Sequence, residues 1–293
     1  MNLTNELDIN PQLLNTINKI KSDIKVTSLC GIDFLNIEDK RAGHTERAIY
    51  NSVPISKLYL GHILQNMSET NQINIIAHEL YHIKHFEELS QHIDYNAISK
   101  AIENPLTIND YKLGLGFAML DEYVAQRNSY KYQKCQLVPE NHAYVPKEMF
   151  KNIIIHIKNY KIFMINNRLH TMGKAFFKLF DSFQDFIYDM ISIMAFSDEN
   201  SPIEKEIIES LLQSELGEEY IRPILEFVNR YYNNPNYNID TYIEFSQLLF
   251  NIFNLCGLGL QQKGKDIMFK LLRKTIIMLR RRESNIRCVI WFI

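Results

Sequence analysis

Two histidines and a glutamate lie within five consecutive residues of this chain. His78 and His82 are four positions apart, and Glu79 directly follows the first histidine. Residues four apart share one face of an α-helix, so both imidazoles can converge on one zinc ion. Glu79 lies beside them and is suited to act as a general base on water without being a ligand. The H-E-x-x-H spacing therefore predicts a catalytic Zn²⁺ centre.

The residues around the motif fit a helix with separate core and site faces. Ile76, Leu80 and Ile83 recur at intervals of three or four residues, and at about 100° per residue they cluster on one side of a helix. His78 and His82 fall roughly opposite them. The alternative hypothesis is an ordinary helical pair of histidines that binds no metal.

A zinc ion held by two helical histidines needs a third protein ligand, with the fourth position left for water. His85 shares the face but follows His78 by seven residues. About 10.5 Å of helical rise separates the two, which is too far for both rings to reach one ion together with His82. The third ligand is therefore expected from another helix.

Glu122 is the best candidate for that ligand. It falls on the same helical side as Ala118 and Ala125, and small residues beside a carboxylate allow two helix backbones to approach closely. Asp121 is the competitor, and it is also suited to accept a hydrogen bond from a ligand imidazole. We favour Glu122 because its side chain reaches further.

The elements that must position these residues are mostly helices. The 293 residues include 10 glycines and 8 prolines, too few to supply the turns of a β-sandwich or barrel of this length. Alternating apolar residues with Gly31 and Gly43 predict a small sheet within residues 24–59. Helices are expected over residues 68–89, 93–102 and 113–132, and through most of the chain from residue 146 onward. The prediction is a mostly helical α+β fold, with a small N-terminal sheet packed on the motif helix and a helical C-terminal region.

A polar segment bracketed by Pro139 and Pro146 is the best place for a domain boundary. We therefore expect a domain of residues 1–140 that contains the motif. Residues 141–293 would form a helical C-terminal domain, for which no motif indicates a role.

Charge is nearly balanced overall but unevenly distributed. The formal net charge is -2, which excludes a global attraction to nucleic acid or to an anionic membrane. Residues 257–287 carry nine basic and two acidic side chains, and residues 198–219 are strongly acidic. The basic segment has three interpretations: a solvated helix face that pairs with the acidic stretch, a nucleic-acid patch, or a surface for a protein partner.

The remaining composition favours a cytoplasmic protein. The cysteines, Cys30, Cys135, Cys256 and Cys288, are scattered and form no C-x-x-C pair, which argues against a zinc ribbon or a redox motif. The first twelve residues lack the apolar segment of a signal peptide. No apolar stretch reaches the ~18 uninterrupted residues of a membrane span. We expect reduced thiols and no membrane partner.

The region of residues 24–136 resembles the gluzincin metallopeptidases, in particular the small intracellular peptidases of the ImmA/IrrE type. The resemblance rests on a strand-rich stretch, the H-E-L-x-H helix from His78 to His82, and an acid-x-x-Ala pattern at Glu122 to Ala125. It implies that His78, His82 and Glu122 bind Zn²⁺ and that Glu79 is the general base. The chain departs from the family because Gln126 stands where the usual pattern ends in asparagine, and no helix-turn-helix domain is recognised.

The resemblance implies an intracellular endopeptidase that cleaves a specific protein, such as a repressor or an antitoxin. The candidate donors to the reaction's oxyanion are His44, His142 and Tyr144. Residues 45–50 are the candidate edge strand for the substrate. The C-terminal region would regulate, select the substrate or bind a protein partner. The alternative is a helical interaction or nucleic-acid-binding module whose metal site is structural or vestigial.

Overall fold

The computed structural model describes residues 9–132 except 37, 40 and 104, residues 155 and 159, and residues 169–198, 202–213, 217–255, 258–263 and 266–271. The first half contains α1 (Pro11–Ile24), β1 (Leu29–Phe34), β2 (Gly43–Tyr50), β3 (Val53–Leu60), η2 (His62–Asn66), α2 (Glu69–Leu89), α3 (Tyr95–Glu103), α4 (Ile108–Ser129) and η3 (Tyr130–Tyr132). The second half contains α6 (Leu169–Asp198), α7 (Pro202–Leu212), η5 (Gly217–Ile221), α8 (Arg222–Asn233), α9 (Ile239–Leu255), β4 (Leu258–Lys263) and β5 (Asp266–Leu271). The predicted α+β, mostly helical fold is confirmed.

The N-terminal sheet has the strand order β1-β3-β2, in which β1 is parallel and β2 antiparallel to β3. Register fixes which side chains of β2 face inward: Thr45 pairs with Leu58 and Arg47 with Ser56. Leu58 and Ser56 are buried, so Thr45 and Arg47 share the face that packs on α2. The sheet therefore directs an arginine toward the motif helix.

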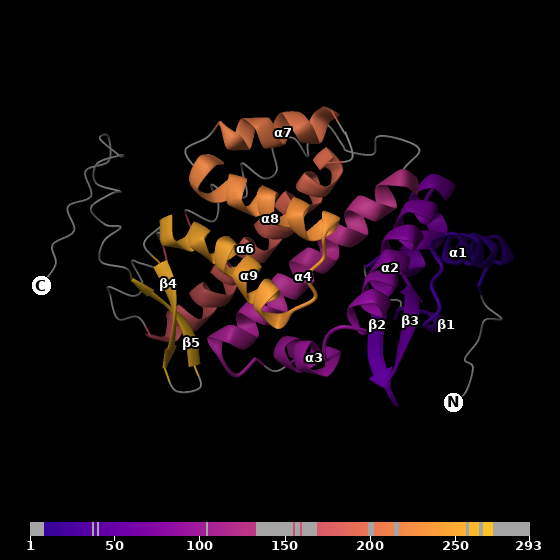
Figure 1. The fold of residues 1–293 in the computed structure, drawn as a ribbon, viewed down its shortest axis with the longest axis horizontal. Coiled ribbons are helices and arrows are strands. Elements are labelled where there is room, and N and C mark those ends of the chain that lie inside the picture. Colours follow the sequence, from indigo (N-terminus) through magenta and orange to yellow (C-terminus); the bar gives the residue numbers. More distant parts are fainter. Residues whose placement is uncertain are drawn as a thin grey trace, which may run out of the picture.

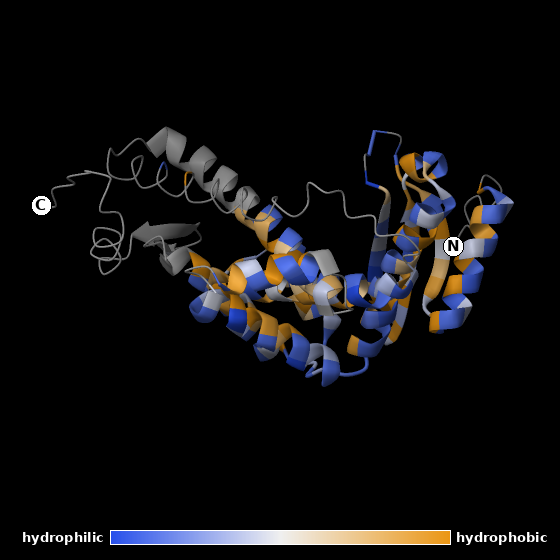
Figure 2. Ribbon diagram, turned by 90° about the horizontal axis from the view of Figure 1, so that it is seen from above, coloured by the Kyte–Doolittle hydropathy of each residue, from blue (hydrophilic) through white to orange (hydrophobic). Residues whose placement is uncertain are grey.

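Helix α2 carries the H-E-x-x-H motif and begins where the sequence predicts. The side chain of its N-cap residue, Ser68, accepts a hydrogen bond from the backbone N–H of Asn71. Ile76, Leu80 and Ile83 are fully buried and belong to a core shared with α1 and the sheet. Figure 2 shows α1 with hydrophobic and hydrophilic residues in alternating bands, the pattern of an amphipathic helix that covers this core.

Helix α4 lies between this sheet-side core and a second core formed with the C-terminal helices. It starts five residues earlier than predicted because Thr107 and Asp110 form a capping box. Its Ala125 contributes to the sheet-side core, while Phe117 and Leu120 pack in the core that includes α6, α8 and α9. Figure 1 shows α4 running between α2 and the C-terminal helices.

Gly116 allows the close approach of α4 to α9. A Cβ atom at this position would lie 1.9 Å from the backbone oxygen of Tyr242. No larger residue fits there without separating the two helices. The glycine thus fixes the C-terminal region against the helix that carries Glu122.

The prediction of helix was wrong for residues 258–263 and 266–271. These two segments pair as the antiparallel hairpin β4–β5, in which each strand is six residues long. Gly264 separates the two strands in the sequence, and a glycine between two short segments is a turn signal that competes with a helical period. The predicted domain boundary at residue 140 and most of the basic segment lie outside the described residues. Among the described helices, none combines the length and the apolar character that crossing a membrane requires.

Candidate metal centre

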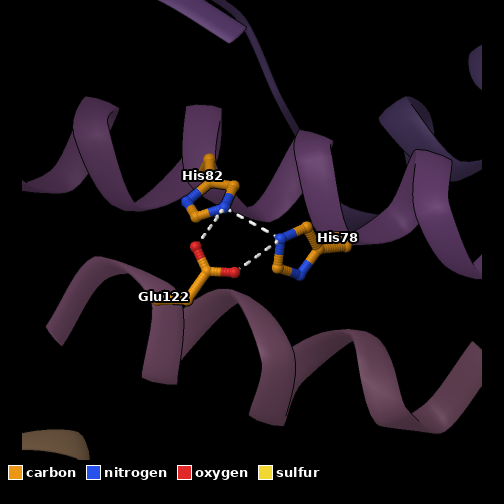
Figure 3. A group of neighbouring side chains, drawn as sticks. All are labelled: His78, His82 and Glu122. Carbon is orange, nitrogen blue, oxygen red and sulfur yellow. Dashed lines mark hydrogen bonds and ion pairs between the residues drawn. The ribbon is translucent and has the colours of Figure 1, made fainter. Parts of the chain in front are cut away.

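Side chains from α2 and α4 converge at one point between the two helices. His78 and His82 project from α2 toward Glu122 of α4 (Figure 3). The two Nε2 atoms are 3.0 Å apart, and the carboxylate oxygens of Glu122 lie 3.1 Å from Nε2 of His78 and 3.4 Å from Nε2 of His82. All three ligand atoms lie within 4.8 Å of one another, so the group could hold a metal ion.

The spacing and the chemistry of the group fit a zinc ion. Two ligand atoms at about 2.0–2.1 Å from a tetrahedral zinc are about 3.3 Å apart. The two Nε2 atoms are 3.0 Å apart, Oε1 of Glu122 lies 3.1 Å from His78 and Oε2 lies 3.4 Å from His82, so all three distances are close to this value. Oε1 of Glu122 is buried and accepts no hydrogen bond from the described part of the chain. Nε2 of His78 lies 3.1 Å from Oε1, but the contact lacks the geometry of a hydrogen bond. Oε1 is therefore available to bind a cation.

The electrostatics of the group favour a positive charge between the helices. Burial alone would lower the pKa of His82, but the carboxylates of Asp121 and Glu122 outweigh burial and raise it to about 10. Burial would likewise raise the pKa of Glu122, but the neighbouring His82 and His78 lower it. A proton on Nε2 of His82 and a metal ion compete for the same lone pair.

Asp121 lies beside the group and contacts the other nitrogen of His82. Its Oδ2 is 2.8 Å from Nδ1 of His82, and Nη1 of Arg47 donates to the same oxygen at 2.7 Å. Burial alone would raise the pKa of Asp121, but Arg47 and His82 hold it well below its ordinary value. An ionised Asp121 can only accept, so Nδ1 of His82 carries the hydrogen and Nε2 is directed at Glu122. Asp121 thus has the geometry of a partner to a ligand imidazole.

Glu79 lines a cleft of about 600 Å³ together with His78, His82 and Glu122. The cleft lies beside β2, whose first residue, Gly43, packs directly on Glu79. A Cβ atom on Gly43 would lie 2.7 Å from Cγ and 3.0 Å from Oε1 of Glu79. The absence of a side chain at residue 43 therefore helps to set the position of the candidate general base.

Gly43→Ala is expected to displace Glu79 without unfolding the chain, because the clash is with a flexible side chain. The peptide hydrolysis that the motif predicts should fall by about 10- to 100-fold, as for a misplacement of about 1 Å in an active site, while the content of the predicted zinc stays the same. Gly31→Ala is the matched control, since its Cβ would meet no atom closer than 3.6 Å. Peptide turnover and zinc content of both variants check this. Equal turnover in the two variants would contradict the role of Gly43.

Of the three oxyanion donors predicted from the sequence, the structure describes only His44. His44 lines the cleft, but it lies on the opposite face of β2 from Arg47 and stacks on Tyr59 at a ring distance of 6.3 Å. Burial and the charge of Arg41 lower the pKa of His44. His142 and Tyr144 lie outside the described residues.

Sequence reasoning included Arg47 only as part of the candidate substrate strand of residues 45–50 and did not single out Tyr188, although both line the cleft. Tyr188 of α6 lines the cleft and is 41% exposed; its partial desolvation, followed by the charge of Glu122, raises its pKa. No local pattern marks Tyr188. Strand alternation could have identified Arg47, because it shares the inward face of β2 with Thr45.

Comparisons of the chain with protein-family models, with curated proteins and with solved structures find no match.

Proposed function

We propose that the chain is a zinc-dependent endopeptidase, similar in its site to the gluzincins of the ImmA/IrrE type. One observation carries the proposal: His78, His82 and Glu122 present ligand atoms at the spacing of a zinc site, and Glu79 lines the same cleft. Two histidines and one carboxylate leave a position for water, as in catalytic rather than structural zinc sites.

Each group in the cleft would have a separate role in peptide hydrolysis. A bound zinc ion would supply Lewis-acid activation of the attacking water and of the scissile carbonyl. Glu79 would accept the proton of the water and deliver it to the amine nitrogen as the C–N bond breaks. Tyr188, which lines the same cleft as Glu79 and Glu122, is a candidate donor to the oxyanion.

The edge of the N-terminal sheet supports an extended peptide as the substrate. β2 is one of the two edge strands of the described N-terminal sheet, and the cleft lies beside its residues 43–47. A second cleft of about 550 Å³, lined by residues of β2, β3 and α3 and by Cys30 of β1, shares Thr45, Arg47 and Ile102 with the first. An extended segment could pair with β2 and place side chains in both clefts. The resemblance further favours a specific regulatory protein as the substrate.

Digestion of peptide libraries tests the proposal directly. Purified chain loaded with zinc is incubated with peptides derived from a proteome, and new termini are identified by mass spectrometry. We expect defined cleavage products that disappear when a chelator removes the metal and return when zinc is added back. A chain that binds about one zinc ion but yields no chelator-sensitive product would favour a structural metal in an interaction module.

A further inference from the structure

A buried chain of hydrogen bonds connects Asp121 to the C-terminal helices. Oδ1 of Asp121 lies 2.7 Å from Nδ1 of His85, and Nε2 of His85 lies 3.0 Å from the hydroxyl of Tyr231. The hydroxyl of Tyr231 in turn lies 3.1 Å from that of Tyr242. This buried hydrogen-bond chain, Asp121–His85–Tyr231–Tyr242, extends from α4 and α2 to α8 and α9.

The members of this chain are polar groups in an apolar environment. Their exposed fractions are 2% for Asp121 and His85, 3% for Tyr231 and 0% for Tyr242. Burying polar groups costs free energy unless each finds a partner, and apolar residues of similar volume often pack equally well. A purely structural interface between α2 and α8 would therefore not need these groups.

The contacts at the Asp121 end of the chain have a defined geometry. Nη1 of Arg47 pairs with Oδ2 of Asp121 at 2.7 Å, and Nδ1 of His85 is placed to donate to the other carboxylate oxygen, Oδ1. The other nitrogen of His85, Nε2, has the hydroxyl of Tyr231 as its hydrogen-bond partner at 3.0 Å. Without that hydroxyl, Nε2 of His85 loses its partner in a buried site, and a turn of the ring toward another partner would disturb its contact with Oδ1 of Asp121.

We propose that Tyr231 and His85 are positioning residues of the metal centre, which hold Asp121 in the orientation that directs Nε2 of His82 at the ion. The inference rests on the zinc site of the proposed function but not on peptidase activity. Asp121 contacts His82 through Oδ2 and His85 through Oδ1, so a rotation that relaxes one contact disturbs the other. The C-terminal helices thus contribute to a metal centre whose ligands all lie in the N-terminal half.

Tyr231→Phe tests the inference, because it removes the hydroxyl and keeps the ring. We expect zinc affinity, measured by competition with a chromophoric chelator, to fall about tenfold, the lower end of the effect of losing a partner of a ligand. The visible absorption spectrum of the Co²⁺-substituted chain should change as well. Tyr232→Phe is the matched control, since this neighbouring hydroxyl donates to Asn128 at 2.8 Å and not to the buried chain.

Repeating Tyr231→Phe in a chain that already carries His85→Asn distinguishes a positioning role of the hydroxyl from a general packing role. In His85→Asn, the amide can still donate to Asp121 but no longer needs Tyr231, so adding Tyr231→Phe should weaken zinc binding no further. Wild-type affinity and spectrum in Tyr231→Phe would overturn the inference, as would equal losses in Tyr231→Phe and Tyr232→Phe. A chain that binds zinc but cleaves no peptide would overturn the proposed function and leave this comparison valid. A wild-type chain that binds no zinc would overturn both.

Discussion

Glu79→Gln is expected to abolish peptide hydrolysis while the chain keeps its metal. Glutamine has the size of glutamate but cannot accept the proton of the attacking water, and loss of general-base catalysis costs about 100- to 10,000-fold in rate. Glu79 is not among the three residues whose ligand atoms converge, so zinc affinity should be unchanged. Glu79 lines the cleft and is not part of the core, so the stability of the fold should not fall.

The comparison needs a control that changes the same chemical group elsewhere on α2. Glu88→Gln serves this purpose because its side chain is 47% exposed and lies away from the cleft. Rate constants for a peptide found by library digestion, together with zinc per chain, give both readouts. Hydrolysis at the wild-type rate in Glu79→Gln would rule out Glu79 as the base. Loss of zinc in this variant would show that Glu79 acts on the metal site itself.

The double variant His78→Ala, His82→Ala is expected to lose the metal entirely. Removing both imidazoles leaves Glu122 alone, and one carboxylate does not hold zinc at the affinity of a three-ligand site. Zinc content should fall from about one ion per chain to none. Zinc at about 1,000 times its Kd should stabilise the wild-type chain by about 4 kcal/mol, and the variant not at all.

The control for this prediction keeps the number of histidines equal. His62→Ala, His92→Ala removes two histidines outside the converging group and should retain both the zinc and the thermal shift. The wild-type chain and the two double variants are compared by metal analysis, by thermal unfolding with and without zinc, and by far-UV circular dichroism. Unchanged zinc content in a folded His78→Ala, His82→Ala chain would refute the metal centre.

The parts of the site that follow a local period were predictable from the sequence. His78 and His82 lie one helical turn apart, so one helix is enough to bring their rings together. Glu122 and Asp121 are adjacent and could not be separated by periodicity alone. The packing of α4 against α2 gives them different roles. Glu122 lies 3.1 Å from Nε2 of His78, in the position of a metal ligand, whereas Asp121 lies 2.8 Å from Nδ1 of His82, the ring nitrogen that faces away from the other ligands.

The parts that depend on contacts between distant segments were not predictable. Arg47 and its partner Asp121 are 74 positions apart, and His85 and Tyr231 are 146 apart. The local sequence does not identify either pair, because an arginine in a strand or a tyrosine in a helix can have many different partners. The hairpin β4–β5 was missed for a related reason, since short apolar runs fit helices and strands equally well.

Helix α4 contributes buried residues to both hydrophobic cores, so its stability depends on both halves of the chain. Unfolding of the C-terminal helices would expose the apolar face of α4 to water, and α4 carries Glu122 and Asp121. The two halves should therefore melt in a single cooperative transition rather than one after the other. Truncation after residue 132 would leave every candidate zinc ligand in the chain, yet it would remove the neighbours that keep α4 folded. The metal centre could be lost by shortening a protein that still contains its complete motif.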